Sequence, residues 1–129
     1  MEKERAYIYT AHVDERGHVI IRRKTGNIKV MDPSKPLQEQ NQITIGNSFK
    51  IRDFYKVYKK QAWYQTDQTL ILPDLDDEEA YHYFRGLLSV KERELTDQLR
   101  SVGKRIDFMI EDYKKGKLVV DDSRGNRNI

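Results

Sequence analysis

The sequence has no cysteine, only three prolines and one tryptophan, and no long apolar run. Without cysteine the chain can form neither disulfides nor thiolate metal sites. No apolar stretch approaches the roughly 20 residues that a membrane-spanning helix needs. The start, MEKERAYIYT, is charged where a secretory signal peptide would be apolar. We therefore expect a cytoplasmic protein without a membrane partner.

Catalytic motifs are also lacking, because the sequence contains no GxSxG, no P-loop and no GxGxxG. His12 and His18 flank one predicted hairpin. A four-residue turn would pair Val13 with His18 and send His12 to the opposite face of the sheet, which argues against a shared metal. His82 stands alone, and no carboxylate group points to a magnesium-dependent nuclease. We expect no enzyme activity, no cofactor and no metal site.

Charge is abundant and unevenly distributed. Charged residues make up 35% of the chain, against roughly 25% in typical globular domains. Residues 1–73 contain 13 Lys or Arg against 8 Asp or Glu, whereas residues 74–129 contain 11 against 13. The excess of basic residues therefore lies in the first half, which is where an anionic partner would bind.

The first half predicts a small α+β unit over residues 1–73. Alternating β-branched and aromatic residues predict strands at 6–13, 18–23 and 28–31, joined by the turns DERG and KTGN into a meander. A short strand follows at 43–45. From Ser48, apolar residues at helical spacing predict an amphipathic helix, namely Ile51, Phe54, Tyr55, Tyr58 and Ala62. Residues 63–64 and 69–72 then predict a further hairpin.

The second half, residues 74–129, predicts a long or broken helical region with a flexible tail at 121–129. Its opening segment DLDDEE carries negative charge where a helix N-terminus favours it, and Asp76 with Glu79 has capping-box spacing. A metal-binding acidic cluster is the alternative explanation. The complete fold class is thus α+β: a small, mostly antiparallel sheet with one amphipathic helix, followed by this helical region.

Apolar residues in the second half also follow a heptad pattern. Leu88, Leu95, Val102 and Met109 occupy position d, and Leu99, Ile106 and Tyr113 occupy position a. From Leu95 onward the spacing is unbroken, as a coiled coil requires, although a helix packed back onto the sheet would show the same pattern. The predicted oligomer or partner interface is Tyr81, Phe84, Leu88, Leu95, Leu99, Val102, Ile106 and Met109.

A competing interpretation divides this segment. Ser89 and Glu92 again have capping-box spacing, and residues 94–120 resemble the helix-turn-helix of bacterial regulators. The resemblance implies a recognition helix that presents Gly103, Lys104, Arg105, Asp107 and Phe108 to the major groove. It also implies a following strand and a wing whose Arg124 and Arg127 reach the DNA backbone. The sequence departs from the pattern at its turn, where Arg100 replaces the usual glycine and Ser101 replaces an apolar residue. The heptad interpretation is therefore preferred.

These observations predict a non-enzymatic, homodimeric nucleic-acid-binding accessory or regulatory protein. The predicted nucleic-acid-binding residues are Arg22, Arg23, Lys24, Arg52, Lys56, Lys59, Lys60, Lys104 and Arg105. Trp63 and Tyr64 could stack on bases if they are exposed, or could belong to the core. The alternative function is a protein–protein interaction module that acts through the C-terminal helical region.

Overall fold

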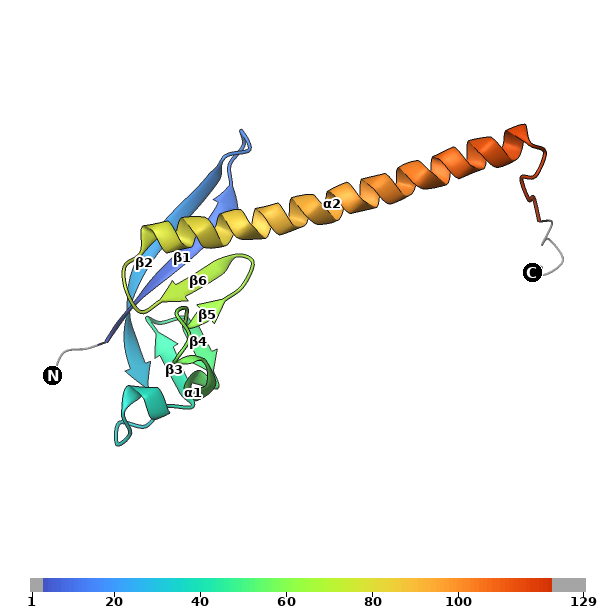
Figure 1. The fold of residues 1–129 in the computed structure, drawn as a ribbon. Helices are drawn as coiled ribbons and strands as arrows, with labels where there is room; N and C mark the ends of the chain where they lie inside the picture. Colours follow the sequence, from blue (N-terminus) through green and yellow to red (C-terminus); the bar gives the residue numbers. More distant parts are fainter. Residues whose placement is uncertain (1–3, 122–129) are drawn as a thin grey trace. The chain divides into compact units, whose positions relative to one another are not determined.

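The computed structural model describes residues 4–121 and divides the chain into two compact units, Met1–Leu88 and Ser89–Ile129. The first unit contains one six-stranded antiparallel sheet (Figure 1). A helix, α2 (Asp77–Lys114), begins in the first unit and continues into the second. The α+β fold class is confirmed. Most of the predicted tail, residues 122–129, lies outside the described residues.

Neighbouring strands of the sheet are hydrogen-bonded in the order β4-β3-β2-β1-β6-β5. Their bounds are β1 (Arg5–Val13), β2 (Val19–Val30), β3 (Gln42–Ile45), β4 (Phe49–Arg52), β5 (Tyr64–Gln65) and β6 (Thr69–Leu72). A 3-10 turn, η1 (Leu37–Glu39), and a short helix, α1 (Phe54–Val57), connect them. The predicted strand at 43–45 and the hairpin at 63–72 are both confirmed.

The predicted three-stranded meander is wrong, because β2 is one strand of twelve residues. The segment KTGN has turn chemistry but remains extended, since β2 changes partner there. It pairs with β1 as far as Asn27 and with β3 from Ile28 onward. Gly26 lies at this change, and a Cβ on it would be only 2.6 Å from Cγ2 of Ile45. The glycine is required for close approach of the two strands rather than for a turn.

The hairpin between β1 and β2 also has a different register from the predicted one. Val13 lies opposite Val19, and His12 lies opposite Ile20, so His18 belongs to the turn. The carboxylate of Asp14 accepts hydrogen bonds from the backbone N–H groups of Arg16 and His18, at 2.9 and 2.8 Å. This side-chain acceptor stabilises a turn that is one residue longer than the DERG sequence predicts.

Strands β1 and β6 are buried on both faces. Their inner face contributes Ile8 and Ile71 to a cluster that is centred on Ile43, Ile45 and Phe54. Their outer face contributes a second cluster, which is covered by the first turns of α2; its members include Tyr9, Leu70, Leu72, Ala80 and Phe84. Because alternate strand residues point to opposite faces, the run TLIL supplies both clusters.

The predicted amphipathic helix from Ser48 to Ala62 is wrong in its bounds. The segment FKIR forms β4, with Ile51 buried and Lys50 and Arg52 exposed. Only Phe54–Val57 is helical, and the preceding Asp53 adopts the left-handed conformation, with φ of 56°. Apolar residues three apart fit a helix, but the same residues fit a strand followed by a tight reversal, which Asp tolerates.

The two edges of the sheet approach each other through aromatic side chains. Phe49 of edge strand β4 packs edge to face on Tyr64 of edge strand β5, with ring centroids 5.3 Å apart. Phe54, Tyr58 and Trp63 form a second group of aromatic contacts beside them. The sheet therefore curls around the inner cluster. Trp63 is part of this core, so its ring is not available for base stacking.

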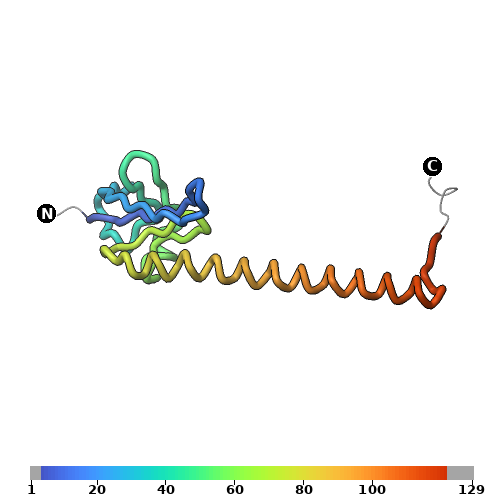
Figure 2. Tube along the Cα trace, turned by 90° about the horizontal axis from the view of Figure 1, so that it is seen from above, coloured from blue at the N-terminus to red at the C-terminus, as the bar shows by residue number. Residues whose placement is uncertain are grey.

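Helix α2 has no break between Asp77 and Lys114 (Figures 1 and 2). The helix-turn-helix interpretation requires a turn near Arg100 and Ser101, and both residues are helical. The helix ends in a Schellman-type motif, in which Gly116 takes a positive φ of 71° and the N–H of Lys117 donates to the carbonyl of Asp112 at 2.8 Å. Residues 117–120 form no strand.

Replacement of Gly26 by alanine tests the close approach of β2 and β3. The added methyl group would overlap Ile45, which is almost completely buried and cannot move away. We expect the free energy of unfolding in urea to fall by about 1–3 kcal/mol. Gly86→Ala is the matched control, because an added Cβ meets open space there; it should raise stability by up to about 1 kcal/mol. Equal stability of Gly26→Ala and the natural protein would contradict the packing argument.

Candidate functional site

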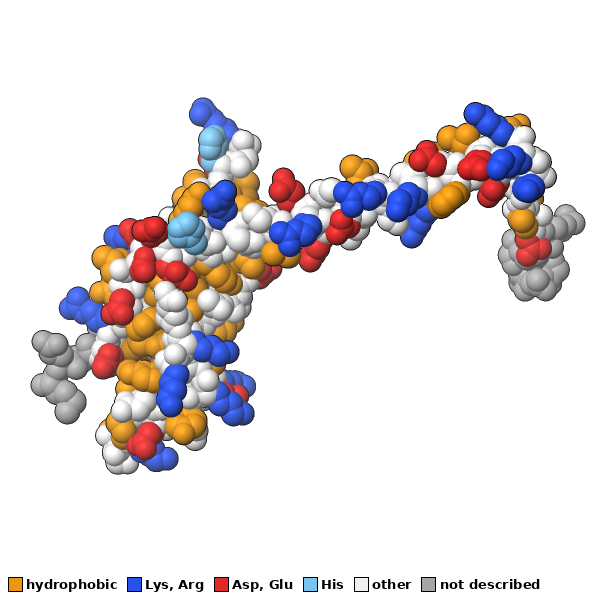
Figure 3. All heavy atoms as spheres, viewed as in Figure 1, with side chains coloured by type: hydrophobic (Ala, Val, Ile, Leu, Met, Phe, Trp, Pro, Cys, Tyr) orange, Lys and Arg blue, Asp and Glu red, His pale blue; other side chains and the backbone are white. Residues whose placement is uncertain are grey.

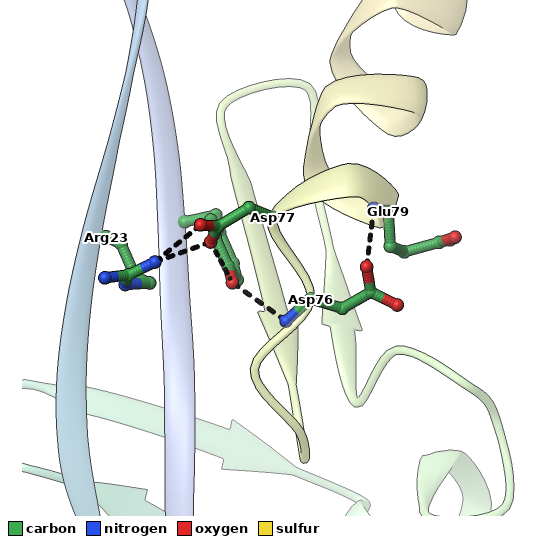
Figure 4. A network of polar contacts seen from close by, with 5 residues as sticks. Arg23, Asp76, Asp77 and Glu79 are labelled. Carbon is green, nitrogen blue, oxygen red and sulfur yellow. Dashed lines mark hydrogen bonds and ion pairs between the residues drawn. The ribbon is translucent and has the colours of Figure 1, made fainter.

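A polar capping network fixes the first turn of α2 on the sheet (Figure 4). The guanidinium of Arg23 donates to both carboxylate oxygens of Asp77 at 2.7 Å. The hydroxyl of Tyr9 donates to the same carboxylate at 2.8 Å and accepts from the backbone N–H of Asp76 at 3.0 Å. The carboxylate of Asp76 accepts from the N–H of Glu79 at 2.9 Å. The acidic segment is therefore a helix cap.

The ionisation of this network follows from its hydrogen bonds. The Arg23 guanidinium and then the Tyr9 hydroxyl lower the pKa of Asp77, because both donate to its charged form. Burial, followed by the hydrogen bond to Asp77, raises the pKa of Tyr9. Across residues 4–121, no group of three or more His, Asp or Glu residues could hold a metal ion. The network serves to position a helix, with Asp77 ionised at neutral pH.

Farther along α2, the heptad pattern forms an exposed apolar seam. We define the α2 seam as Leu88, Leu95, Leu99, Val102, Ile106, Met109 and Tyr113. Each of these side chains is between 46% and 74% exposed. The other two predicted interface residues differ in their exposure to solvent. Tyr81 is half exposed, whereas Phe84 is buried in the outer core cluster with Leu70 and Leu72. Phe84 is thus used for packing within the first unit.

The predicted basic residues of β2 are divided between the two faces of the sheet. Arg23 lies opposite Tyr9 and points to Asp77, whereas Arg22 and Lys24 lie opposite Thr10 and Ile8 on the other face. Three consecutive cations in an extended strand cannot share a face, because successive side chains alternate. The sequence run RRK therefore does not form one anion-binding cluster.

Register brings together a different basic group, which we call the basic strand face: Lys29, Lys50 and Arg52. Lys29 lies opposite Thr44, and Thr44 lies opposite Lys50 on the next strand. All three cations are exposed, on the face opposite buried Ile43 and Ile51. Adjacent strands are about 4.8 Å apart, so Lys29 and Lys50 lie roughly 10 Å from each other. Lys29 and Lys50 were not predicted, although alternation in FKIR could have indicated Lys50.

The remaining predicted basic residues lie in three places. Lys56 is in α1, and Lys59 and Lys60 are exposed in the turn after it. Figure 3 shows Lys and Arg side chains gathered beside α1 on the face in view. Lys104 and Arg105 are exposed on α2, in the second unit. Arg124 and Arg127, the predicted wing residues, lie outside the described residues.

A shallow pocket lies between the β1–β2 hairpin and the part of α2 in the first unit. Its lining includes Val13, Val19, Phe84 and Leu88. Its volume of about 140 Å³ is well below the roughly 300–1,000 Å³ of typical small-molecule sites. The pocket is therefore a surface feature of the outer core cluster rather than a candidate ligand site.

Comparison with protein-family models, curated proteins and solved structures finds no match to this chain. Among the helices of residues 4–121, none is both long and apolar enough to cross a membrane. Function must therefore be inferred from the surfaces described above, of which the α2 seam and the basic strand face are the two with a defined geometry.

The capping network predicts a specific dependence of stability on pH. The pKa of Asp77 is lower in the folded protein than in the unfolded chain, so its contribution is present above about pH 3.9 and is lost as pH falls through the folded value. We expect Asp77→Asn to unfold at lower urea concentration than the natural protein at pH 6, and this difference to shrink toward pH 2.5. Asp74→Asn, which removes a neighbouring exposed carboxylate outside the network, is the control. If the difference in unfolding midpoint between Asp77→Asn and the natural protein stayed constant with pH, the ion pair between Arg23 and Asp77 would not stabilise the fold.

Proposed function

We propose that the protein is a non-enzymatic binding protein that associates with a second copy of itself through the α2 seam. The observation that supports this most strongly is the exposure of all seven seam residues on one uninterrupted helix. Their alternating four- and three-residue spacing is the pattern of a helix that packs against another helix.

The opposite side of the same helical segment is mainly charged, with Val90 and Phe108 as exposed apolar residues among the charges. It carries Arg93, Asp97, Lys104 and Glu111, all exposed. Asp97 and Arg100 are within ion-pair distance, 3.6 Å, one helical turn apart. Most of the stability of such a helix comes from packing of its apolar face, because the intrinsic preference of a charged sequence contributes little. Self-association would supply that packing.

The seam can be tested by comparing two exposed apolar residues of α2. Leu99 lies in the seam, whereas Phe108 lies outside it, and both are exposed in the single chain. Burial of a leucine contributes about 1.5–3 kcal/mol, and a dimer buries two, so Leu99→Glu should weaken self-association at least about 100-fold. Phe108→Glu should leave it nearly unchanged. Sedimentation equilibrium over micromolar concentrations measures both variants.

The natural protein should sediment with twice the mass of the chain, and Leu99→Glu as the single chain. Circular dichroism of both variants checks that the strands remain folded, which we expect because neither residue is part of the core clusters. A natural protein that stays monomeric at every concentration would overturn the proposed self-association. Equal effects of the two substitutions would overturn the assignment to the seam.

Nucleic-acid binding is the second candidate function, and the basic strand face favours it. Lys29 of β2 and Lys50 of β4 lie on either side of Thr44, and Arg52 lies opposite Gln42, so polar side chains of β3 lie among the cations. Such a face would contact phosphates without reading sequence, so its affinity would depend steeply on salt.

Charge reversal on this face tests the second function. In fluorescence anisotropy with a labelled single strand and a labelled duplex, binding should weaken between 50 and 200 mM salt. The double variant Lys50→Glu, Arg52→Glu should bind at least about tenfold more weakly, with a salt slope smaller by about 2. Arg16→Glu, Lys35→Glu changes the net charge equally, at exposed positions in two turns, and should bind more like the natural protein. Absence of submicromolar binding at low salt would exclude this function.

A further inference from the structure

We infer that the two copies pair with their α2 helices antiparallel, with Leu99 of each chain level with Val102 of its partner. The inference rests on the proposed self-association and adds its orientation and register. It comes from three features of α2: the symmetry of the seam, the position of Glu92, and the charges beside the seam.

The seam is symmetric about a point between Leu99 and Val102. In an antiparallel pair, each position a of one helix packs against a position d of the other. The register then uses the complete seam, from Leu88 at one end to Tyr113 at the other. The resulting layers pair Leu99 with Val102, Leu95 with Ile106, Glu92 with Met109, and Leu88 with Tyr113, and each layer occurs twice.

Glu92 distinguishes the two orientations. It occupies position a, in line with the seam, and is exposed in the single chain. In a parallel pair in register, Glu92 would face the partner's Glu92, so two like charges would meet between the helices. In the antiparallel pair it faces the partner's Met109, whose flexible side chain adapts to irregular neighbours. The antiparallel orientation therefore separates the two carboxylates.

The residues beside the seam favour the same orientation. Position g is occupied by Lys91, Gln98, Arg105 and Asp112. In the antiparallel register, Lys91 faces the partner's Asp112, and this pair of opposite charges occurs twice in each dimer. Gln98 faces the partner's Arg105. In a parallel pair, position g would face position e of the partner, which is occupied by Thr96, Gly103 and Ile110. None of these can form an ion pair.

The antiparallel register has a consequence for the assembly. The two Leu88 residues, at which the first units end, are separated by 25 residue steps along the paired helices, or about 38 Å at 1.5 Å per residue. The first units of the two chains are thus attached at opposite ends of the helix pair.

Spin labels can measure the orientation directly, because the chain has no cysteine of its own. One variant carries Glu111→Cys and the other carries Ser101→Cys, both at exposed positions outside the seam. In the antiparallel dimer the two labels at 111 are separated by about 32 Å along the axis, whereas those at 101 are nearly level. Pulsed electron paramagnetic resonance on each singly labelled dimer should therefore give a clearly longer distance for 111. In a parallel dimer the two positions would give similar distances.

Charge exchange provides an independent test of the register. Lys91→Asp should weaken self-association about 3–10-fold, because it places like charges at two contacts in each dimer. The double variant Lys91→Asp, Asp112→Lys should restore it. Restoration is expected only if the two positions face each other, since they lie 21 residues apart in one helix and cannot contact within a chain.

The outcomes separate the inference from the proposal on which it rests. A monomeric natural protein overturns both. A dimer in which positions 101 and 111 give similar distances overturns the antiparallel orientation and leaves self-association intact. A dimer with the expected distances in which charge exchange restores nothing overturns the register.

Discussion

Burial of β1 and β6 on both faces is the constraint on which the first unit depends. The sheet covers the inner face by curling until Phe49 and Tyr64 of its two edge strands meet. It cannot cover the outer face, where Tyr9, Leu70 and Leu72 would remain exposed without the first turns of α2. The helix is therefore an integral part of the unit, and the capping network determines where it begins. Tyr9 links the two tasks, because its ring is in the core and its hydroxyl contacts Asp76 and Asp77.

The sequence predicted features that depend on local chemistry. The cap at Asp76 and the final hairpin require only neighbouring residues to form their hydrogen bonds. Apart from the register of the β1–β2 hairpin, which the Asp14 carboxylate within the turn determines, predictions failed where a distant strand decided the outcome. The KTGN segment remains extended because β3 pairs with the residues that follow it, and Ile51 lies in a strand because Ile43 lies opposite it. Neither partner can be identified from local spacing.

The same distinction applies to the candidate surfaces. The α2 seam could be predicted because helical periodicity alone places its residues on one side, whatever they contact. Phe84 could not be assigned, because only the fold shows that the sheet covers it. The basic strand face depends on register between three strands, so even where alternation in FKIR places Lys50 beside Arg52, the sequence cannot show that Lys29 lies near them. Proximity along the chain favoured Arg22, Arg23 and Lys24, which alternation then separates.

Glu92 has opposite effects on the strength and on the specificity of a helix pair. An apolar residue at this position would extend the clean seam toward Leu88 and strengthen association in either orientation. A carboxylate at this position weakens both orientations. It weakens the parallel pair, in which it faces the partner's Glu92, far more than the antiparallel pair, in which it faces Met109. Leucine, valine and isoleucine side chains pack in either direction, so they do not select an orientation. The orientation therefore depends on the charges of Glu92, Lys91 and Asp112. In the helix pair that we propose, the few charged residues would select the partner's direction, while the apolar residues would provide the affinity.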